Sequence, residues 1–465
     1  MTIHWIVQWA LVLLLGVGTT LTLSSFLLSD EPEATNAYLE EPGTGGSSTA
    51  PEVPAPIDHV PSKALSKRIV EYHIAVVLHP DSKTLEGTQT FSWTNPGSKP
   101  VNELYLHLYP NAFQSKNTTF MQESGGKLRN DKHQPGSFGR MDITRLTTSL
   151  GEDLLPRTAF VRPDDGNEHD QTLMKVLLTE PVAPGETITL TADFIVQLPA
   201  VFARMGYSGN FFMAGQWFPK LAKFEPAGTR GRTEDGWNLH QYHGNSEFYA
   251  DFGIYNVKIK VPESYTVAAT GFPVKSPTVN KGMKTYHFYA DDVHDFAWAA
   301  SSDFLYFEEG FSAPDIPGVK IKLYLDPAHE SLKDRYFAAA KKTLARLGAW
   351  IGEYPYQTLS IVVPPPGGNG AGGMEYPTLI TAWAADEPDT GYELERVIVH
   401  EIGHQYWYGM IASNEFEEAW LDEGFTSYAE DKIMELEYGV EPNLPIIGSY
   451  MTTPEALTLH SWQFA

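Results

Sequence analysis

The 465-residue chain contains no cysteine. Disulfide bonds, thiolate metal sites and cysteine nucleophiles are therefore excluded. If the chain binds a metal ion, the ligands must be histidine, aspartate or glutamate side chains.

Basic residues are also scarce, with 33 Lys and Arg against 58 Asp and Glu, which gives a formal net charge of -25. Proteins that bind nucleic acid need a basic surface, so the composition argues against a nucleic-acid partner. The acidic balance is compatible with cationic small molecules or peptides as ligands. It is equally compatible with an ordinary solvated acidic surface.

Charge is absent altogether from residues 5–28, "WIVQWALVLLLGVGTTLTLSSFLL". A helix of that length would measure about 36 Å and could cross a hydrocarbon core of about 30 Å. Asp30 and Glu31 follow at once, and no Lys or Arg precedes the run. We expect residues 1–29 to be a transmembrane signal anchor that leaves the rest of the chain extracytoplasmic. Secretion after cleavage of a signal peptide is the alternative.

The rest of the chain divides by composition and periodicity. Residues 30–62 are rich in Pro, Gly and Ser, which is typical of a flexible linker. Residues 63–312 contain short alternating runs such as "EYHIAVVLHP", which predict a β-rich antiparallel domain. Residues 313–465 add helical periodicity, with long helices expected at about 392–411 and about 417–438. The predicted fold is therefore α+β and multidomain.

The run "VIVHEIGHQYWYG" places three polar side chains in an apolar helix. His400 and His404 are four residues apart and lie one above the other, so both imidazoles can bind one zinc ion. Glu401 stands beside them as the general base that acts on a water molecule. Satisfied structural polar groups are the alternative interpretation.

A third ligand is predicted at Glu423 in "AWLDEGFTSYAED", expected in the middle of the next helix, with eighteen residues between it and His404. Two histidines and one glutamate leave a fourth coordination position open, which is the arrangement of a catalytic zinc. The sequence therefore predicts one Zn²⁺ per chain.

Three linked motifs, "HEIGH", "WLDEGF" at 420–425 and "GGMEY" at 372–376, resemble the gluzincin aminopeptidases of the aminopeptidase N type. The family has Asn where this chain has Tyr376. The resemblance extends from about Lys67 to the end of the chain. It implies a β-rich N-terminal domain followed by a thermolysin-like zinc catalytic domain.

The resemblance also implies a substrate site. Glu375 corresponds to the family carboxylate that binds the free α-amino group of a peptide, and Gly372, Gly373 and Met374 are expected to lie along the substrate. Gln216, in "GNFFMAGQWFPKLAKFEP", is a candidate for a second amine-recognition group, although a loop glutamine is the simpler interpretation.

For other polar residues the sequence leaves more than one role open. Glu430 and Ser427 follow Glu423 on the same predicted helix, where either could orient a zinc-binding histidine or face solvent. His240 and His243 in "WNLHQYHGNSEF" have no matching carboxylate spacing, and we expect structural or surface roles for them.

One family element has no counterpart in the sequence. The family places a tyrosine about sixty residues after the zinc glutamate to stabilise the oxyanion. Only 42 residues follow Glu423 here, and Tyr450 comes too early for that role. We therefore expect an incomplete catalytic domain with slow turnover.

The sequence thus predicts a membrane-anchored zinc metallopeptidase, preferentially an aminopeptidase that hydrolyses N-terminal residues from peptides through a zinc-activated water. Its expected partners are peptides with a free N-terminus, and the membrane. The alternatives are a zinc endopeptidase and a catalytically weak, membrane-tethered peptide-binding homologue.

Overall fold

The computed structural model describes residues 51–55, 63–128, 131–314, 316–383, 391–440, 444–446 and 449–451. All of these residues belong to one compact unit that spans residues 49–465. The predicted transmembrane anchor lies outside the described residues, as does most of the predicted linker. None of the helices in the described ranges is both long enough and apolar enough to cross a membrane.

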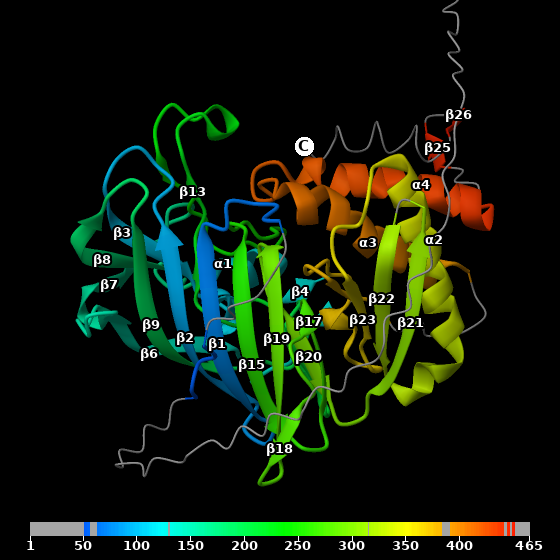
Figure 1. Cartoon of the computed structure of the whole chain (residues 1–465), viewed down its shortest axis with the longest axis horizontal. Coiled ribbons are helices and arrows are strands. Elements are labelled where there is room, and N and C mark those ends of the chain that lie inside the picture. The colour runs from blue at the N-terminus through cyan, green and yellow to red at the C-terminus, as the bar shows by residue number, and fades with distance from the viewer. Residues whose placement is uncertain are drawn as a thin grey trace, which may run out of the picture. The chain divides into compact units, whose positions relative to one another are not determined.

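The β-rich region is built on an eight-stranded sheet in the order β17-β19-β15-β1-β2-β9-β6, with β18 paired to β19 (Figure 1). Its strands are β1 (Val70–His79), β2 (Thr84–Thr94), β6 (Arg140–Thr148), β9 (Thr187–Gln197), β15 (Gly253–Pro262), β17 (Phe272–Pro273), β18 (Thr278–Asn280) and β19 (Met283–Val293). The neighbours pair antiparallel, as the alternating pattern predicts, except that β1 and β15 are parallel. A parallel pair requires a long connection, which the strands from β2 to β14 provide.

Two four-stranded sheets pack against this sheet, in the orders β12-β3-β8-β7 and β10-β11-β20-β16. Their strands are β3 (Val101–His107), β7 (Thr158–Phe160), β8 (Leu173–Val182), β10 (Gly206–Ser208), β11 (Phe211–Ala214), β12 (Lys220–Leu221), β16 (Thr266–Ala269) and β20 (Trp298–Ser301). Every second residue of β1, from Val70 to Leu78, is at most 3% exposed. Strand alternation therefore supplies one apolar face to a shared core.

The helical region has its own four-stranded sheet in the order β21-β22-β23-β24. Its elements are β21 (Leu305–Ala313), β22 (Ile316–Leu325), α2 (Lys333–Trp350), β23 (Thr358–Val363), β24 (Leu379–Thr381), α3 (Glu393–Ile411) and α4 (Glu423–Tyr438). β21 pairs antiparallel to β22, whereas β22, β23 and β24 run parallel. This sheet begins at Leu305, so the predicted domain boundary at 312–313 falls at the end of its first strand.

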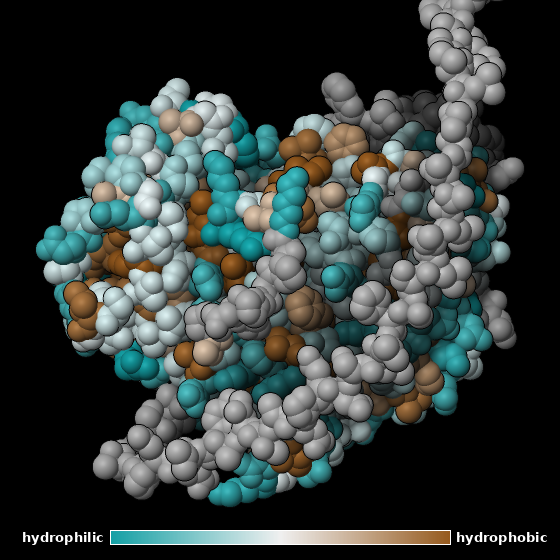
Figure 2. Space-filling view, in the orientation of Figure 1, coloured by the Kyte–Doolittle hydropathy of each residue, from teal (hydrophilic) through white to brown (hydrophobic). Residues whose placement is uncertain are grey.

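The remaining elements are short. They are η1 (Tyr109–Phe113), α1 (Thr119–Ser124), β4 (Lys127–Leu128), β5 (Asp131–Lys132), η2 (Leu155–Arg157), β13 (Phe224–Glu225), η3 (Thr229–Gly231), β14 (Gly236–Trp237), η4 (Pro327–Leu332), η5 (Asn369–Ala371), η6 (Ala419–Leu421), β25 (Leu444–Ile446) and β26 (Ser449–Met451). On the face shown in Figure 2, hydrophobic residues form separate small areas among hydrophilic and neutral ones. Scattered exposed apolar residues of this kind are normal for a globular protein.

The second long helix begins later than the sequence predicts. Glu423 is the first residue of α4, so its predicted position in the middle of a helix is wrong. α3 ends where Ala412 adopts a φ of 49°, and the side-chain Oδ1 of Asn414 then accepts hydrogen bonds from the N–H groups of Phe416 (3.0 Å) and Glu417 (3.2 Å). Asn that bonds to the following backbone favours a turn over a helix. Residues 412–422 therefore form a connecting loop, which we call the 412–422 loop.

α3 and α4 approach each other closely at Gly403, the residue before His404. A Cβ atom at Gly403 would lie only 2.8 Å from Cγ2 of Thr426 in α4. Glycine at this position therefore lets the first turn of α4 pack directly against the histidine motif of α3.

We predict that Gly403→Ala destabilises the protein. Overpacking costs about 1–3 kcal/mol, and the better helix propensity of alanine offsets about 1 kcal/mol, so the net loss of stability should be at most about 2 kcal/mol. Thermal unfolding followed by circular dichroism measures this. Thr426→Ser removes the methyl group that the new Cβ would strike, so the double variant should recover most of the loss. A double variant as unstable as Gly403→Ala would contradict the packing explanation.

Candidate metal centre

The α3–α4 contact brings the three predicted zinc ligands together. The Nε2 atoms of His400 and His404 are 3.0 Å apart. Oε2 of Glu423 lies 3.3 Å from Nε2 of His400 and 3.7 Å from Nε2 of His404. One donor atom from each residue therefore lies within 4.8 Å of the other two.

The other ring nitrogen of each histidine is held by a carboxylate. Nδ1 of His404 is 2.6 Å from Oδ1 of Asp422, and Nδ1 of His400 is 2.8 Å from Oε2 of Glu430. A carboxylate at Nδ1 fixes the ring orientation and leaves Nε2 available to a metal. Glu430 thus lies where its predicted orienting role requires, and it also binds Arg396. Thr426, rather than Ser427, faces His404 among the described residues, with Oγ1 3.3 Å from Nδ1.

The donor set fits zinc, because two imidazole nitrogens and one carboxylate oxygen are ligands of catalytic zinc sites. Without a metal ion the two imidazoles attract protons instead, because, despite their burial, the surrounding carboxylates raise the pKa of both histidines. Burial opposes charging of His400, but its bonds to Glu423 and Glu430 raise its pKa to about 10. A bound metal ion must displace this proton, so it takes the place of the positive charge that the carboxylates already stabilise.

Two further carboxylates border the ligands. Glu401 is 4% exposed and Glu375 is 7% exposed. One oxygen of each lies within 4.8 Å of the other and of a ring nitrogen of His404. Burial raises the pKa of Glu375 well above its ordinary value, and the nearby Glu247 adds to this effect. An external cation at Glu375 would therefore relieve an unfavourable buried charge.

The segment that carries Glu375 is fastened to α3 by Gln405, which the sequence analysis missed. Its Nε2 donates to the carbonyl oxygen of Glu375 at 2.9 Å, and its Oε1 accepts from the N–H of Thr378 at 2.8 Å. Gln405 directly follows His404, so its position beside the motif was the available signal. One helix thus positions both the metal ligands and the predicted amine anchor.

The residues before Glu375 have structural reasons for their identity. A Cβ atom at Gly372 would lie 2.3 Å from the Trp383 ring, and Gly373 has a φ of 67°. Gly373 also donates its N–H to the carbonyl of Thr381 at 2.7 Å, and Met374 bridges to the same residue. Packing and backbone conformation therefore account for both glycines, whatever they contact in a substrate.

Tyr376, which replaces the family asparagine, packs into the β-rich region. A Cβ atom at Gly215 would lie 2.1 Å from its hydroxyl oxygen, so the tyrosine fits only because residue 215 is glycine. The neighbouring Gln216 donates to Asp295, and its Oε1 accepts from Lys220 at 3.1 Å. Lys220 and Asp295 form a buried ion pair, 3.0 Å apart and each 2% exposed. The Gln216 amide bonds to both members of this pair and is therefore occupied by structural contacts.

Asp422 and Arg204 are other site neighbours that the sequence analysis missed. Asp422 is adjacent to Glu423, and the need of His404 for a carboxylate partner could have identified it. Arg204 forms an ion pair with Glu247, and its Nη1 lies 3.0 Å from Sδ of Met374. No spacing in the sequence relates these residues of the β-rich region to the histidine motif.

Comparisons with known proteins agree with this geometry. Residues 338–458 match the Peptidase family M1 domain. Aminopeptidase B of Mus musculus is 30% identical over 127 residues, which cover 26% of this chain and 19% of that protein. The chain therefore matches about a fifth of the length of this curated relative.

The fold is similar to solved structures of an M1 zinc metallopeptidase from Deinococcus radiodurans. A mutant form has a TM-score of 0.51 at 18% identity and covers 81% of this chain and 75% of that chain. A mutant form bound to a Tyr-Ser-Ala substrate has a TM-score of 0.50 at 16% identity, with the same coverage. Together with the donor set, the matches confirm the predicted family resemblance and the predicted zinc cofactor.

We predict that His404→Ala and Glu423→Gln abolish stoichiometric zinc binding, because each removes one of three donor atoms. Glu401→Gln should keep its zinc, since Glu401 stands beside the ligands without completing the set. Atomic absorption of the purified variants measures this. Zinc loss in Glu401→Gln would contradict these assignments.

Asp422→Asn should weaken zinc binding about 10- to 100-fold, which is typical when a partner of a ligand histidine is replaced. The amide offers an oxygen at the same place but lacks the negative charge that stabilises the ring orientation. Competition with a chelator gives the dissociation constant. Ser427→Ala is the matched control, and equal effects of the two changes would contradict the role of Asp422.

Proposed function

We propose that this chain is a zinc-dependent aminopeptidase that releases the N-terminal residue of peptides. The observation that carries this proposal is the proximity of Glu375, Glu401 and His404, which have donor atoms within 4.8 Å of one another. The nitrogen and the carbonyl carbon of one residue are only about 2.5 Å apart. A peptide whose ammonium group binds Glu375 therefore presents its first peptide bond to the metal centre.

Glu375 supports exopeptidase rather than endopeptidase activity. A free ammonium group forms a charge-assisted hydrogen bond with the buried carboxylate. A peptide with a blocked N-terminus, or an internal segment, brings no positive charge and leaves the carboxylate unpaired. Because burial raises the pKa of Glu375, its carboxyl group then takes up a proton, and the charge-assisted bond that favours a free N-terminus is lost.

The other residues of the site have three roles: binding the metal ion, orienting its ligands and transferring a proton. His400, His404 and Glu423 hold the zinc ion, and Asp422 and Glu430 keep the two imidazoles oriented. When bound, zinc polarises the scissile carbonyl and lowers the pKa of water. Glu401 accepts the proton of the attacking water and delivers it to the leaving amine.

Peptides with a free N-terminus are thus the proposed substrates, in line with the tripeptide bound to the Deinococcus relative. The hydroxyl group of Tyr376 packs against Gly215, so in its observed position Tyr376 is not the group that stabilises the oxyanion.

The proposal keeps the extracytoplasmic, membrane-anchored placement that the sequence suggests. It is supported by the uncharged run at residues 5–28 and the acidic residues after it. Secretion after signal cleavage is the alternative placement, and both are compatible with a peptidase that acts on extracytoplasmic peptides.

We predict that Glu375→Gln lowers kcat/KM for peptides with a free N-terminus about a hundredfold, equivalent to about 2.7 kcal/mol. Glutamine keeps the shape of the side chain but cannot pair with the ammonium charge. The same substrates with an acetylated N-terminus should show little further loss. Equal loss on both series would mean that Glu375 is structural and that the exopeptidase assignment is wrong.

A further inference from the structure

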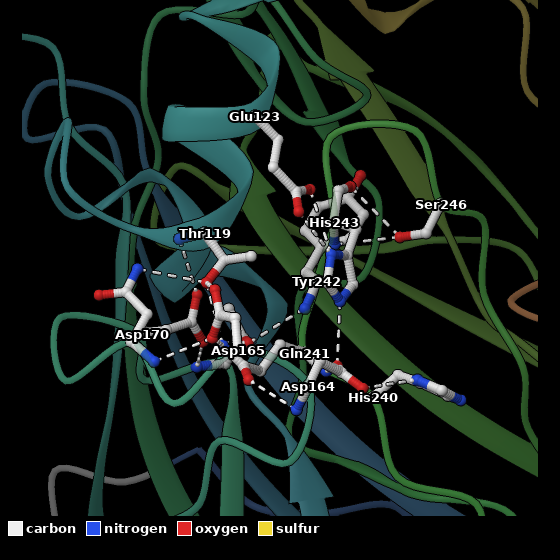
Figure 3. A network of polar contacts seen from close by, with 12 residues as sticks. Thr119, Glu123, Asp164, Asp165, Asp170, His240, Gln241, Tyr242, His243 and Ser246 are labelled. Atoms are coloured by element: carbon white, nitrogen blue, oxygen red, sulfur yellow. Dashed lines mark hydrogen bonds and ion pairs between the residues drawn. The ribbon is translucent and has the colours of Figure 1, made fainter.

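A row of alternating acidic and imidazole side chains lies outside the metal centre (Figure 3). Nδ1 of His243 is 2.9 Å from Glu123 on α1, and its Nε2 is 2.9 Å from Asp164. Nδ1 of His240 is 3.0 Å from the same aspartate. Its Nε2 is 3.1 Å from Glu417 in the 412–422 loop. The row therefore connects the β-rich region to the loop that leads into α4.

Both histidines need a second proton to make all these contacts. Ionised carboxylates only accept hydrogen bonds, and a neutral imidazole has a single N–H. His240 lies between two carboxylates, as does His243, so only the imidazolium form donates at both ends. The complete row thus alternates in charge from Glu123 to Glu417.

The surrounding charges favour this protonated form. The hydrogen bond to Asp164 raises the pKa of His240 against the effect of burial, and Glu417 raises it further. The same aspartate, with Glu123, raises the pKa of His243 to about 9. Burial works against ionisation of Asp164, but its bonds to the two histidines hold its pKa below the ordinary value.

The 412–422 loop is attached to the β-rich region at this point. Phe416 stacks on the His240 ring, with centroids 5.0 Å apart and planes at 21°. Glu417 also accepts from Nδ2 of Asn238 at 2.7 Å and pairs with Arg230, which in turn binds Glu418. Arg230 also pairs with the buried Glu225, so a cation and an amide hold Glu417 in addition to His240.

A single short turn separates this attachment from the metal centre. The turn of η6 follows Glu418, and the N–H of Asp422 bonds to the carbonyl of Ala419 at 3.1 Å. The carbonyl of Asp422 then accepts from the N–H of Thr426 at 2.9 Å, inside the first turn of α4. A shift at Glu417 therefore moves the backbone that carries Asp422 and Glu423.

We propose that His240 is a positioning residue for the metal centre, because its contacts with Asp164 and Glu417 fix the 412–422 loop and so the carboxylates of Asp422 and Glu423. The inference rests on the zinc site of the proposed function but not on the peptidase reaction. It assigns His240 a role beyond the structural or surface one that the sequence suggests.

The contribution of His240 depends on pH in a defined direction. The pKa of His240 is higher in the folded protein than in the unfolded chain, so His240 makes both contacts, with Asp164 and with Glu417, at pH values below the ordinary histidine pKa. One of the two contacts is lost as the pH rises through the pKa of the folded state, because His240 then keeps a single N–H. Zinc binding should therefore depend on His240 at neutral pH and less so at alkaline pH.

The test compares the full chain with His240→Gln, which keeps one N–H donor at similar size but carries no charge. Zinc dissociation constants are measured by chelator competition from about pH 6 to about pH 9.5, a range that spans the charge change of a histidine with a raised pKa. We expect the variant to bind zinc about three- to tenfold more weakly near pH 6, below the effect of replacing a direct partner of a ligand. The ratio of variant to wild-type constants should fall toward one as the pH rises. Titration of the zinc ligands themselves affects both proteins and cancels in this ratio.

Glu417→Gln removes the opposite partner and should give the same pH-dependent ratio, which also carries the test if His240→Gln fails to fold. His243→Gln is the control, because His243 does not contact the 412–422 loop, and its ratio should be clearly smaller. A ratio of one at every pH would overturn the proposal. A raised ratio that does not change with pH would also overturn it, since packing on Phe416 alone would then be responsible. Absence of zinc from the wild-type protein would instead refute the zinc site, which makes the two failures distinguishable.

Discussion

The metal centre depends on one constraint: a carboxylate binds Nδ1 of each histidine, and Nε2 of each is left to bind the metal ion. Asp422 and Glu430 occupy the Nδ1 positions of His404 and His400, so both Nε2 atoms turn toward Glu423. Without these carboxylates the rings could rotate, and the spacing of four residues on α3 would not define a common point. The close approach of the two helices at Gly403 makes the arrangement possible, because it brings the start of α4 within reach of the motif.

Helix α3 also positions the segment that contains Glu375. Gln405 fastens the main chain of Glu375, the proposed amine anchor, to α3, and α3 also carries His400, His404 and the proposed base Glu401. Sites built on regular elements hold their geometry better than sites on free loops. The one ligand that depends on a loop is Glu423, and there the β-rich region fastens the loop through Phe416 and Glu417.

Local features of the site could be predicted from the sequence, because they depend on spacing within a few residues. α3, the histidine pair and its glutamate follow from helical periodicity. Glu423 was predicted as the third ligand from its place in "AWLDEGFTSYAED", with eighteen residues between it and His404. The start of α4 could not be predicted in this way, since the side chain of Asn414 ends the helical pattern. Gln216 was a reasonable amine contact from its segment, but the buried Lys220 and Asp295 use its amide. The parallel pairing of β1 with β15, and the row from Glu123 to Glu417, connect segments that no local pattern relates.

The contact between Gly215 and Tyr376 constrains how this site can evolve. The tyrosine ring occupies space that exists only because residue 215 lacks a side chain, and the two residues come from different regions of the fold. An asparagine at position 376, the residue that the resembled motif has there, would leave that space unfilled, while a larger residue at 215 would displace the tyrosine. Each residue is therefore acceptable only in the presence of the other. The two positions form an epistatic pair, so a descendant that changes one must pass through a less stable intermediate or change both together.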